Sequence, residues 1–461
     1  MQPPFDIAAD LDTPVSAFMK LESFQPRFLL ESVEGGERLA RYSFIGFGDA
    51  VTYRLDSDGL RIDGQVRERP ATQDHLLDTL RETLSRAPHP GKGLSGLPLQ
   101  GGLVGIAGYD MVRYFESLPR KAEAVPGHPE AAFVAPRSML VFDHLTRRVA
   151  LLHDGEEAER ERLKKDVIRA LRGPLPDQGG SGRHLAPKTS FSAEEFCEAV
   201  EKAKDHIRQG DVYQLVLSVQ FSGECSIPPF EVYRALRCLN PSPYLFYLDF
   251  DGIAVVGSSP EALVKLEGRE AFLRPIAGTR PRGVDVEQDE ANEKELLADP
   301  KEAAEHVMLV DLARNDLGRV GLAGTVRVDP YRTIERYSHV MHIVSGVRGV
   351  LDPKSDAMDL FAATFPAGTV VGAPKVRAME LIEELEPVRR GIYAGTAGYF
   401  AAGGSMDQAI TIRTLAFHDG KYFYQAGAGI VADSIAEKEF EEVMAKSEVL
   451  RSALRLAEEG L

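Results

Sequence analysis

The stretch RPIAGTRPRG, residues 274–283, places three arginines, two prolines and two glycines in ten positions. Pro275 and Pro281 each lack a backbone N–H, so a regular helix cannot run through this segment. Gly278 can adopt backbone angles that other residues reach only with strain. We therefore expect a rigid loop that is rich in hydrogen-bond donors and framed by positive charge. At its centre stand the two small residues Ala277 and Gly278, which together carry a single methyl group.

Helices are indicated on both sides of this stretch, each with a recognisable start. A capping residue followed by glutamate three positions later, or by proline at the first helical position, begins a helix. Three such signals occur: Ser192 with Glu195, Asp299 with Pro300, and Ser434 with Glu437. Strand-like segments such as DVYQLVLSVQF (211–221) and KYFYQAGAGI (421–430) lie between the helices. The two types mix without a regular βαβ alternation, which predicts an α+β fold.

Composition suggests a division of the chain. Residues up to about 155 are typical of short strands and turns, and a helical pattern follows. The next segment, PLPDQGGSGRHLAPKTS, is rich in Pro, Gly and Ser and has no periodicity. We predict an N-terminal segment over 1–175, a linker or mobile loop over 176–190, and a second domain over 191–461.

The overall charge limits the classes of partner. The 461 residues include 54 basic and 70 acidic side chains, a net charge of −16, which argues against a nucleic-acid partner. No apolar run approaches the length of a membrane span, and the N-terminus lacks the pattern of a signal peptide. The three cysteines show no metal-ligand spacing. We therefore expect a cytoplasmic protein that binds neither membranes nor nucleic acid.

Two pairs of glutamates have a spacing suited to a metal. Glu302 and Glu305 lie three positions apart and therefore on one face of a helix, and Glu439 and Glu442 repeat this spacing near the C-terminus. Two such helices facing each other would offer the oxygen ligands that Mg²⁺ prefers. The alternative is local, because Glu302 also follows the Asp299 cap at the position of a capping glutamate.

Other polar residues have a structural alternative as well. His342 stands in an apolar strand pattern, where a core histidine is common. Tyr393 and Arg413 also stand in apolar, strand-like segments, and a buried arginine needs a carboxylate partner from the protein or a ligand. The glycine-rich stretches 427–432 and 368–375 resemble nucleotide-binding loops, but neither has the required context. Their backbone N–H groups could instead bind a carboxylate.

Six motifs together resemble the chorismate-utilising enzymes, most closely component I of the anthranilate synthases. They are RPIAGTRPRG, DEANEKELLADPKEAAEHVMLVDLARNDLGRV, FPAGTVVGAPKVRAMELIEELEP, RRGIYAGTAGYF, MDQAITIRT and QAGAGIVADS, in this order. The resemblance is dense over about 190–455. It implies a large sandwich of antiparallel sheets with outer helices, onto which the N-terminal segment packs.

The resemblance also implies roles for individual residues. The substrate would be chorismate and the cofactor Mg²⁺, held by Glu302, Glu305, Glu439 and Glu442. Glu261 would protonate the departing 4-hydroxyl group and His342 would assist proton removal, with Thr369 beside them. The substrate carboxylates would be held by Gly278, Thr279, Tyr393, Arg413, Gly427, Ala428, Gly429 and Lys446.

Two positions distinguish branches of the family. The water-using members carry a lysine base where this chain has Gln214, and aminodeoxychorismate synthases typically carry a lysine nucleophile where it has Ala277. Both lysines are absent here, so the resemblance implies direct attack by ammonia, as in anthranilate synthase. An aminodeoxychorismate synthase component and an inactive component that senses tryptophan or docks an amidotransferase remain as alternatives.

The resemblance implies a partner and a regulator. No glutaminase cysteine motif occurs, so a separate glutamine amidotransferase subunit would supply the ammonia. L-tryptophan would inhibit the enzyme at a second site, which makes 1–175 a regulatory segment. The residues implied for this site are Glu31, Ser32, Asn240, Pro241, Ser242, Pro243, Tyr244 and Leu245.

Overall fold

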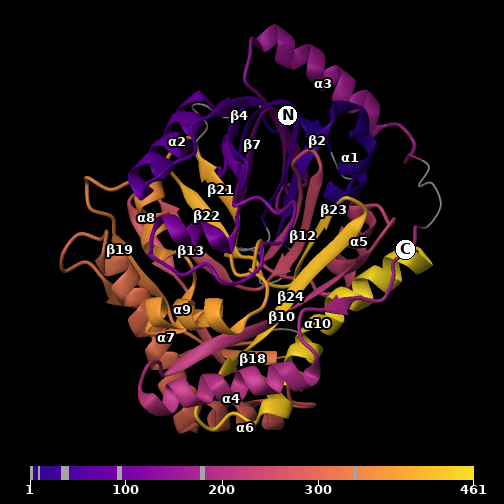
Figure 1. The fold of residues 1–461 in the computed structure, drawn as a ribbon. Helices are drawn as coiled ribbons and strands as arrows, with labels where there is room; N and C mark the ends of the chain where they lie inside the picture. Colours follow the sequence, from indigo (N-terminus) through magenta and orange to yellow (C-terminus); the bar gives the residue numbers. More distant parts are fainter. Residues whose placement is uncertain (1–3, 9–10, 33–40, 91–95, 177–181, 337–339) are drawn as a thin grey trace.

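The chain folds into antiparallel sheets whose outer surfaces are covered by helices, as the computed structural model in Figure 1 shows. The structure describes residues 4–8, 11–32, 41–90, 96–176, 182–336 and 340–461. The predicted α+β class and sandwich are confirmed by this arrangement. No helix in the described ranges is long and apolar enough to cross a membrane.

The helices have the following bounds. They are α1 (Pro14–Lys20), η1 (Glu22–Phe24), α2 (Gln73–Arg86), η2 (Tyr109–Tyr114), α3 (Glu157–Leu171), α4 (Ala193–Gln209), α5 (Pro229–Leu239), α6 (Val286–Ala298), α7 (Pro300–Gly318), α8 (Ala357–Thr364), η3 (Gly368–Val370), α9 (Lys375–Leu385) and α10 (Ala436–Glu459). In Figure 1, α3 lies at one end of the molecule and α4 and α6 lie at the other.

The strands lie between these helices along the chain, several of them in uninterrupted runs. They are β1 (Ile7–Ala8), β2 (Pro26–Glu31), β3 (Tyr42–Asp56), β4 (Gly59–Ile62), β5 (Gln65–Arg67), β6 (Gly102–Ala107), β7 (Ala131–Asp143), β8 (Arg148–His153), β9 (Lys188–Thr189), β10 (Gln214–Glu224), β11 (Tyr244–Asp249), β12 (Ile253–Ser259), β13 (Ala262–Glu267), β14 (Glu270–Leu273), β15 (Ile276–Pro281), β16 (Arg327–Val328), β17 (Thr333–Arg336), β18 (Val340–Val344), β19 (Val347–Val350), β20 (Gly372–Ala373), β21 (Thr396–Ala401), β22 (Met406–Ile410), β23 (Thr414–His418) and β24 (Lys421–Ile430).

Strands from the two ends of the chain share one hydrogen-bonded sheet. In the described ranges, 21 strands are connected in this way. The N-terminal strand β2 pairs with β11, and β6 pairs with β21. Sheet hydrogen bonds therefore connect the N-terminal segment to the rest of the chain across the predicted boundary at residue 175. In the predicted linker, residues 177–181 lie outside the described residues, and β9 pairs with β10.

The opening stretch, 274–283, is not the loop that we expected. Residues Ile276–Pro281 form strand β15, which pairs with β18 in a separate three-stranded sheet. The register shifts between Ala277 and Thr279, where Gly278 has a φ of 67°. Such a left-handed residue favours glycine and produces a β-bulge. Pairing with a distant strand decided this structure, which local composition could not reveal.

Two of the three expected helix starts are confirmed. The Ser192 side chain accepts a hydrogen bond from the backbone of Glu195, and Asp299 caps α7 ahead of Pro300. The third prediction is wrong, because α10 begins after Ile435 without a side-chain cap. Ser434 instead accepts a hydrogen bond from the backbone N–H of Val431.

The helices that pack on β10 and β24 do so with one apolar face. In α4 the buried side chains recur at intervals of three and four residues: Phe196, Ala199, Val200 and Ala203. This is the period of an amphipathic helix that covers a sheet. α10 packs against α4, α5 and β24, and its Lys446 donates to the Gly427 carbonyl oxygen of β24.

Candidate active site

The glycine segment of β24 provides an open sheet edge. β10 pairs with β24 along Gly427–Ile430, whereas β23 pairs with β24 only as far as Tyr424. Alternate backbone groups of an antiparallel strand point to opposite edges. Within the described ranges, the second edge of Gly427–Gly429 therefore has no strand partner and can bind a carboxylate. Lys446 marks its end by donating to the Gly427 carbonyl oxygen at 3.0 Å.

Tyr393 reaches this edge from another part of the chain. A Cβ atom at position 427 would lie 2.8 Å from the Tyr393 hydroxyl oxygen, so Gly427 permits the close approach. Tyr393 is buried and lies in the turn before β21, and Arg413 lies between β22 and β23 with a φ of 50°. The strand placement that we expected for both residues is therefore wrong.

His342 and Thr279 are neighbours across the β15–β18 ladder. The His342 Nδ1 atom lies 2.9 Å from the Gly278 carbonyl oxygen and 3.1 Å from the Thr279 hydroxyl oxygen. Because a carbonyl oxygen only accepts, Nδ1 carries the proton and Nε2 is the basic nitrogen. Burial lowers the pKa of His342, and the nearby Arg413 charge lowers it further. His342 is thus held neutral, as a proton acceptor requires.

Glu302 lies directly behind the Gly278 bulge. A Cβ atom at Gly278 would be 3.0 Å from a Glu302 carboxylate oxygen. Arg280 donates to Glu302 at 3.2 Å and also to Asp299 and Glu295. The arginines of this stretch therefore pair with acids of the chain itself, since Arg274 and Arg282 also bond Glu335 and Asp289 respectively.

Glu305 lies one turn further along α7, in an open cleft. The cleft has a volume of about 690 Å³ and is lined by α7, by Gln214 and by the residues after β24. Burial raises the pKa of Glu305 and the neighbouring Glu302 charge raises it further, while a hydrogen bond from Gln214 and the charge of Lys446 lower it. A Cβ atom at Gly429 would lie 2.6 Å from the Gln214 amide nitrogen. Gln214 thus joins the glycine edge to α7.

The four predicted metal ligands stand on two helices, α7 and α10, and the charge of Lys446 on α10 acts on Glu305 of α7. Glu302 and Glu305 repel each other on α7, and Glu442 on α10 pairs with Lys446 at 2.7 Å. Among the described residues, no three His, Cys, Asp or Glu side chains converge into a metal-binding group. Glu302 and Glu305 alone fit a divalent cation in their chemistry, because both are oxygen donors and their mutual repulsion would be relieved by its charge.

Glu261 occupies a smaller cavity at the other side of α7. This cavity of about 40 Å³ is lined by Glu261, Thr369 and Arg274, and Leu312 lines both it and the open cleft. Burial raises the pKa of Glu261 to about 7, and the Thr369 hydroxyl lowers it. Among the described residues, the Thr369 hydroxyl oxygen is buried without a hydrogen-bond partner within ordinary bonding distance. Glu261 is therefore partly protonated at neutral pH, as a general acid must be.

The residues predicted to bind tryptophan also meet. Glu31 and Leu245 are direct partners across β2 and β11, so LLES and NPSPYL are adjacent. Glu31 is buried and accepts hydrogen bonds from Tyr233 and Arg237. Two of these three hydrogen bonds reach Oε2 and one reaches Oε1, so Oε1 keeps acceptor capacity for a further donor.

Asn240 and Tyr244 extend from this region towards other parts of the fold. Asn240 bonds Ser258 at 2.8 Å and lies 3.5 Å from an Arg413 nitrogen, so it reaches a predicted substrate residue. The Tyr244 hydroxyl donates to Asp407 at 3.1 Å. Of the remaining predicted residues, Ser242 is buried and Ser32 is half-buried. The regulatory role of all of them stays a prediction.

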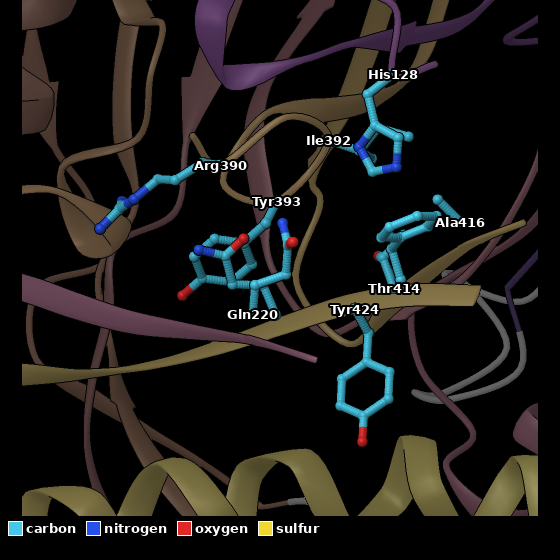
Figure 2. A pocket seen from close by; sticks show the side chains of 10 residues that line it. His128, Gln220, Arg390, Ile392, Tyr393, Thr414, Ala416 and Tyr424 are labelled. Atoms are coloured by element: carbon cyan, nitrogen blue, oxygen red, sulfur yellow. The ribbon is translucent and has the colours of Figure 1, made fainter. Parts of the chain in front are cut away.

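Sequence reasoning missed some neighbours of the site. Arg280 was noted only as part of a positive frame, and its carboxylate partners emerged from the packing of α6 and α7 onto β15. Arg390 and Glu386 form a buried pair behind Tyr393. The two residues stand four positions apart in the sequence. However, both lie beyond the end of α9 at Leu385, where this spacing does not predict a contact. Figure 2 shows Arg390 and Tyr393 beside a small internal pocket.

Comparisons with known proteins agree with this geometry. Residues 25–452 match the family model described as chorismate binding enzyme. The chain is 48% identical to anthranilate synthase component 1 of Thermus thermophilus over 98% of this chain and 97% of the relative. It is 44% identical to the protein of the same name from Acetivibrio thermocellus, over 98% and 95% respectively.

Solved structures give the same result. The crystal structure of anthranilate synthase component I from Streptococcus pneumoniae matches with a TM-score of 0.81 and 39% identity, covering 89% of this chain and 92% of that one. The menaquinone-specific isochorismate synthase of Escherichia coli shares the fold, with a TM-score of 0.70 and 21% identity over 96% and 92%. The chain therefore belongs to the chorismate-binding enzyme family, in the group whose members are component 1 of anthranilate synthase.

Proposed function

We propose that the chain is the chorismate-converting component of an anthranilate synthase, a lyase that turns chorismate and ammonia into anthranilate, pyruvate and water. Its similarity to anthranilate synthase component 1 proteins over nearly the full length supports this assignment. The observation that carries it within the family is the pair Gln214 and Ala277, because neither side chain can act as a base or a nucleophile. Ammonia then attacks ring carbon C2 directly.

The chain's own residues divide the work of the reaction. Glu261 is partly protonated at neutral pH. It gives its proton to the departing 4-hydroxyl group, which leaves as water. His342 takes the ring proton through Nε2 when pyruvate is eliminated. Arg413 and Tyr393 hold the enolpyruvyl carboxylate, while the Gly427–Gly429 edge holds the ring carboxylate.

We further propose that Mg²⁺ is the cofactor. Glu302 and Glu305 on α7, with Glu439 and Glu442 on α10, would hold it. When bound, the ion supplies positive charge to the ring carboxylate and to the leaving oxygen. The mutual repulsion of Glu302 and Glu305 supports this assignment.

The partner and the regulator complete the proposal. A separate glutamine amidotransferase subunit would deliver ammonia, and the open cleft beside Gln214 offers a route to the site. L-tryptophan would bind where LLES meets NPSPYL and inhibit the reaction. The contact between Asn240 and Arg413 supports such a link, because one end lies in the proposed tryptophan site and the other holds substrate. The acidic, cysteine-poor composition suits a cytoplasmic location.

An isotope experiment tests the assignment. The purified chain is supplied with chorismate, Mg²⁺ and ¹⁵N-labelled ammonium at mildly alkaline pH, and the products are identified by mass spectrometry. We expect labelled anthranilate and pyruvate in equal amounts, and no anthranilate from glutamine without a partner subunit. The Glu261→Gln variant is the control. Labelled aminodeoxychorismate as the end product would point to the folate-branch alternative, and absence of turnover would point to an inactive binding component.

A further inference from the structure

A fully buried ion pair lies behind the proposed substrate site. Arg390 and Glu386 approach to 2.7 Å, and their side chains are only 1% and 2% exposed. The contact is bidentate: Arg390 Nε donates to one Glu386 carboxylate oxygen and Nη2 donates to the other. Two charges are expensive to bury, and a pair at this depth is by itself weak evidence for stability. Stabilisation of the fold alone therefore does not account for this buried pair.

The pair hydrogen-bonds to backbone that carries proposed active-site residues. Arg390 donates to the Val370 carbonyl oxygen at 2.6 Å, next to Thr369, and to the Val216 carbonyl oxygen at 2.8 Å in β10. Glu386 accepts from the Ser218 backbone N–H at 2.9 Å and from its hydroxyl at 2.7 Å. The two side chains thus connect η3 to the strand that begins with Gln214.

Arg390 also supports Tyr393. Its guanidinium lies 5.6 Å from the centre of the Tyr393 ring and 5.1 Å from that of Tyr109, which is the geometry of a cation–π contact. Figure 2 shows Arg390 on the same side of the pocket as Tyr393. The Tyr393 hydroxyl meanwhile approaches Gly427. Arg390 therefore contacts the rear of a ring whose other end lies at the substrate edge.

We propose that Arg390 and Glu386 are positioning residues, which set Thr369, Tyr393 and the start of β10 relative to one another so that chorismate is held against Glu261. This inference rests on the proposed function, because it assigns roles within that reaction. The alternative is a purely structural pair that holds the layers together without tuning the site. The two differ in what happens when both charges are removed.

Removing both charges together separates the two roles. Arg390→Met leaves Glu386 buried and unpaired, which lowers the melting temperature strongly. Arg390→Met with Glu386→Met removes both charges, and apolar replacement of a buried pair is often tolerated. We expect the double variant to regain much of the lost melting temperature. Its KM for chorismate stays at least about tenfold raised and its kcat lowered, since about 1.4 kcal/mol of positioning corresponds to tenfold.

A milder variant covers the case in which the methionine variants do not fold. Arg390→Lys keeps the charge but loses the planar fork that reaches two carbonyl oxygens. We expect it to fold and to show the same raised KM for chorismate, with the KM for ammonium unchanged. Unchanged kinetics in a folded Arg390→Lys variant would overturn the positioning role.

Arg113→Met is the matched control. Arg113 pairs with Glu383 at 2.7 Å with exposures of 9% and 7%, and it also bonds Asp110, but in the described part of the chain its hydrogen bonds reach only Asp110, Pro119 and Glu383, none of them a proposed site residue. We expect a lower melting temperature with chorismate kinetics within about twofold of wild type.

Chorismate binding, measured by calorimetry with Mg²⁺ and without ammonium, provides a readout that does not need turnover. Recovery of both stability and chorismate affinity in the double variant would overturn the positioning role and leave a structural pair. Wild-type chain that binds no chorismate would instead remove the proposed function, and this inference with it.

Discussion

Glu261 and Glu31 are both enclosed by the protein, yet their surroundings differ. Glu261 lines a small cavity, has no cationic partner that affects its pKa, and is raised to a pKa of about 7 by burial. Glu31 is 6% exposed and accepts hydrogen bonds from Arg237 at 3.0 and 3.3 Å and from Tyr233. Glu261 lies beside an empty volume, whereas Glu31 is held by a guanidinium and a hydroxyl group.

The charged partners around a buried carboxyl group decide whether it can transfer a proton or serves to hold the packing. A buried carboxyl without a cation favours its protonated form and can transfer that proton near neutral pH. A carboxylate that a guanidinium holds from two sides is kept in place, and removal of one partner is costly. The surroundings of Glu261 therefore suit proton transfer, whereas those of Glu31 hold its carboxylate in one place.

The largest effect is expected at Glu261. Glu261→Gln keeps the shape of the side chain but removes the transferable proton, so kcat should fall by about 10²–10⁴. Anthranilate fluorescence measures the rate, and calorimetry should show nearly unchanged chorismate binding. A variant with the melting temperature of wild type and more than about a third of its kcat would contradict the role as general acid.

Removal of a metal ligand should come next. Mutation of a residue that hydrogen-bonds to a metal ligand typically lowers metal affinity by roughly 10–100-fold. Glu302→Gln or Glu305→Gln removes a ligand itself and should therefore weaken Mg²⁺ binding by more than this. Titration calorimetry with Mg²⁺ alone tests this without turnover. Glu295→Gln is the control, because Glu295 also bonds Arg280, at 3.1 Å, but is not a proposed ligand. Equal Mg²⁺ affinity in all three variants would refute the site.

The raised pKa of Glu261 predicts a pH dependence. Above about pH 7 the acid is lost, so kcat at saturating free ammonia should fall by about tenfold per pH unit, and Glu261→Gln should lack this limb. Folding stability should follow the same group. The folded pKa is raised above the ordinary value of 4.5, so this contribution is complete below about 4.5 and is lost as pH rises through about 7. A flat rate profile between pH 6 and 9 would contradict the assignment.

The smallest effect on catalysis is expected in the N-terminal region. Ser32→Arg should leave kcat within about twofold of wild type and raise the inhibitory concentration of L-tryptophan at least about tenfold, or about 1.4 kcal/mol. By thermodynamic linkage, chorismate should weaken tryptophan binding by the same factor by which tryptophan weakens chorismate binding. Calorimetry with each ligand in the presence of the other measures this. Wild-type enzyme that ignores millimolar tryptophan would leave this region with a structural role only.

Local sequence signals predicted well what depends on neighbours along the chain. The caps at Ser192 and Asp299 lie where expected, and Glu302 and Glu305 share a face of α7. Such signals act over three or four residues, so they survive in any fold. Ser434 does not cap α10, because its hydroxyl oxygen accepts a hydrogen bond from the backbone N–H of Val431 instead.

By itself, the sequence determined the family, the α+β class, the helices that carry the glutamates and the absence of a nucleophile at Gln214 and Ala277. Only the tertiary structure decided that residues 276–281 form a bulged strand, and that Arg390 and Glu386 meet behind Tyr393. It also decided that Glu31 pairs with Arg237, whereas no cation among the described residues shifts the pKa of Glu261. Burial and charge pairing depend on residues that are distant in the chain, and they set the backbone at Gly278 and the pKa of Glu261.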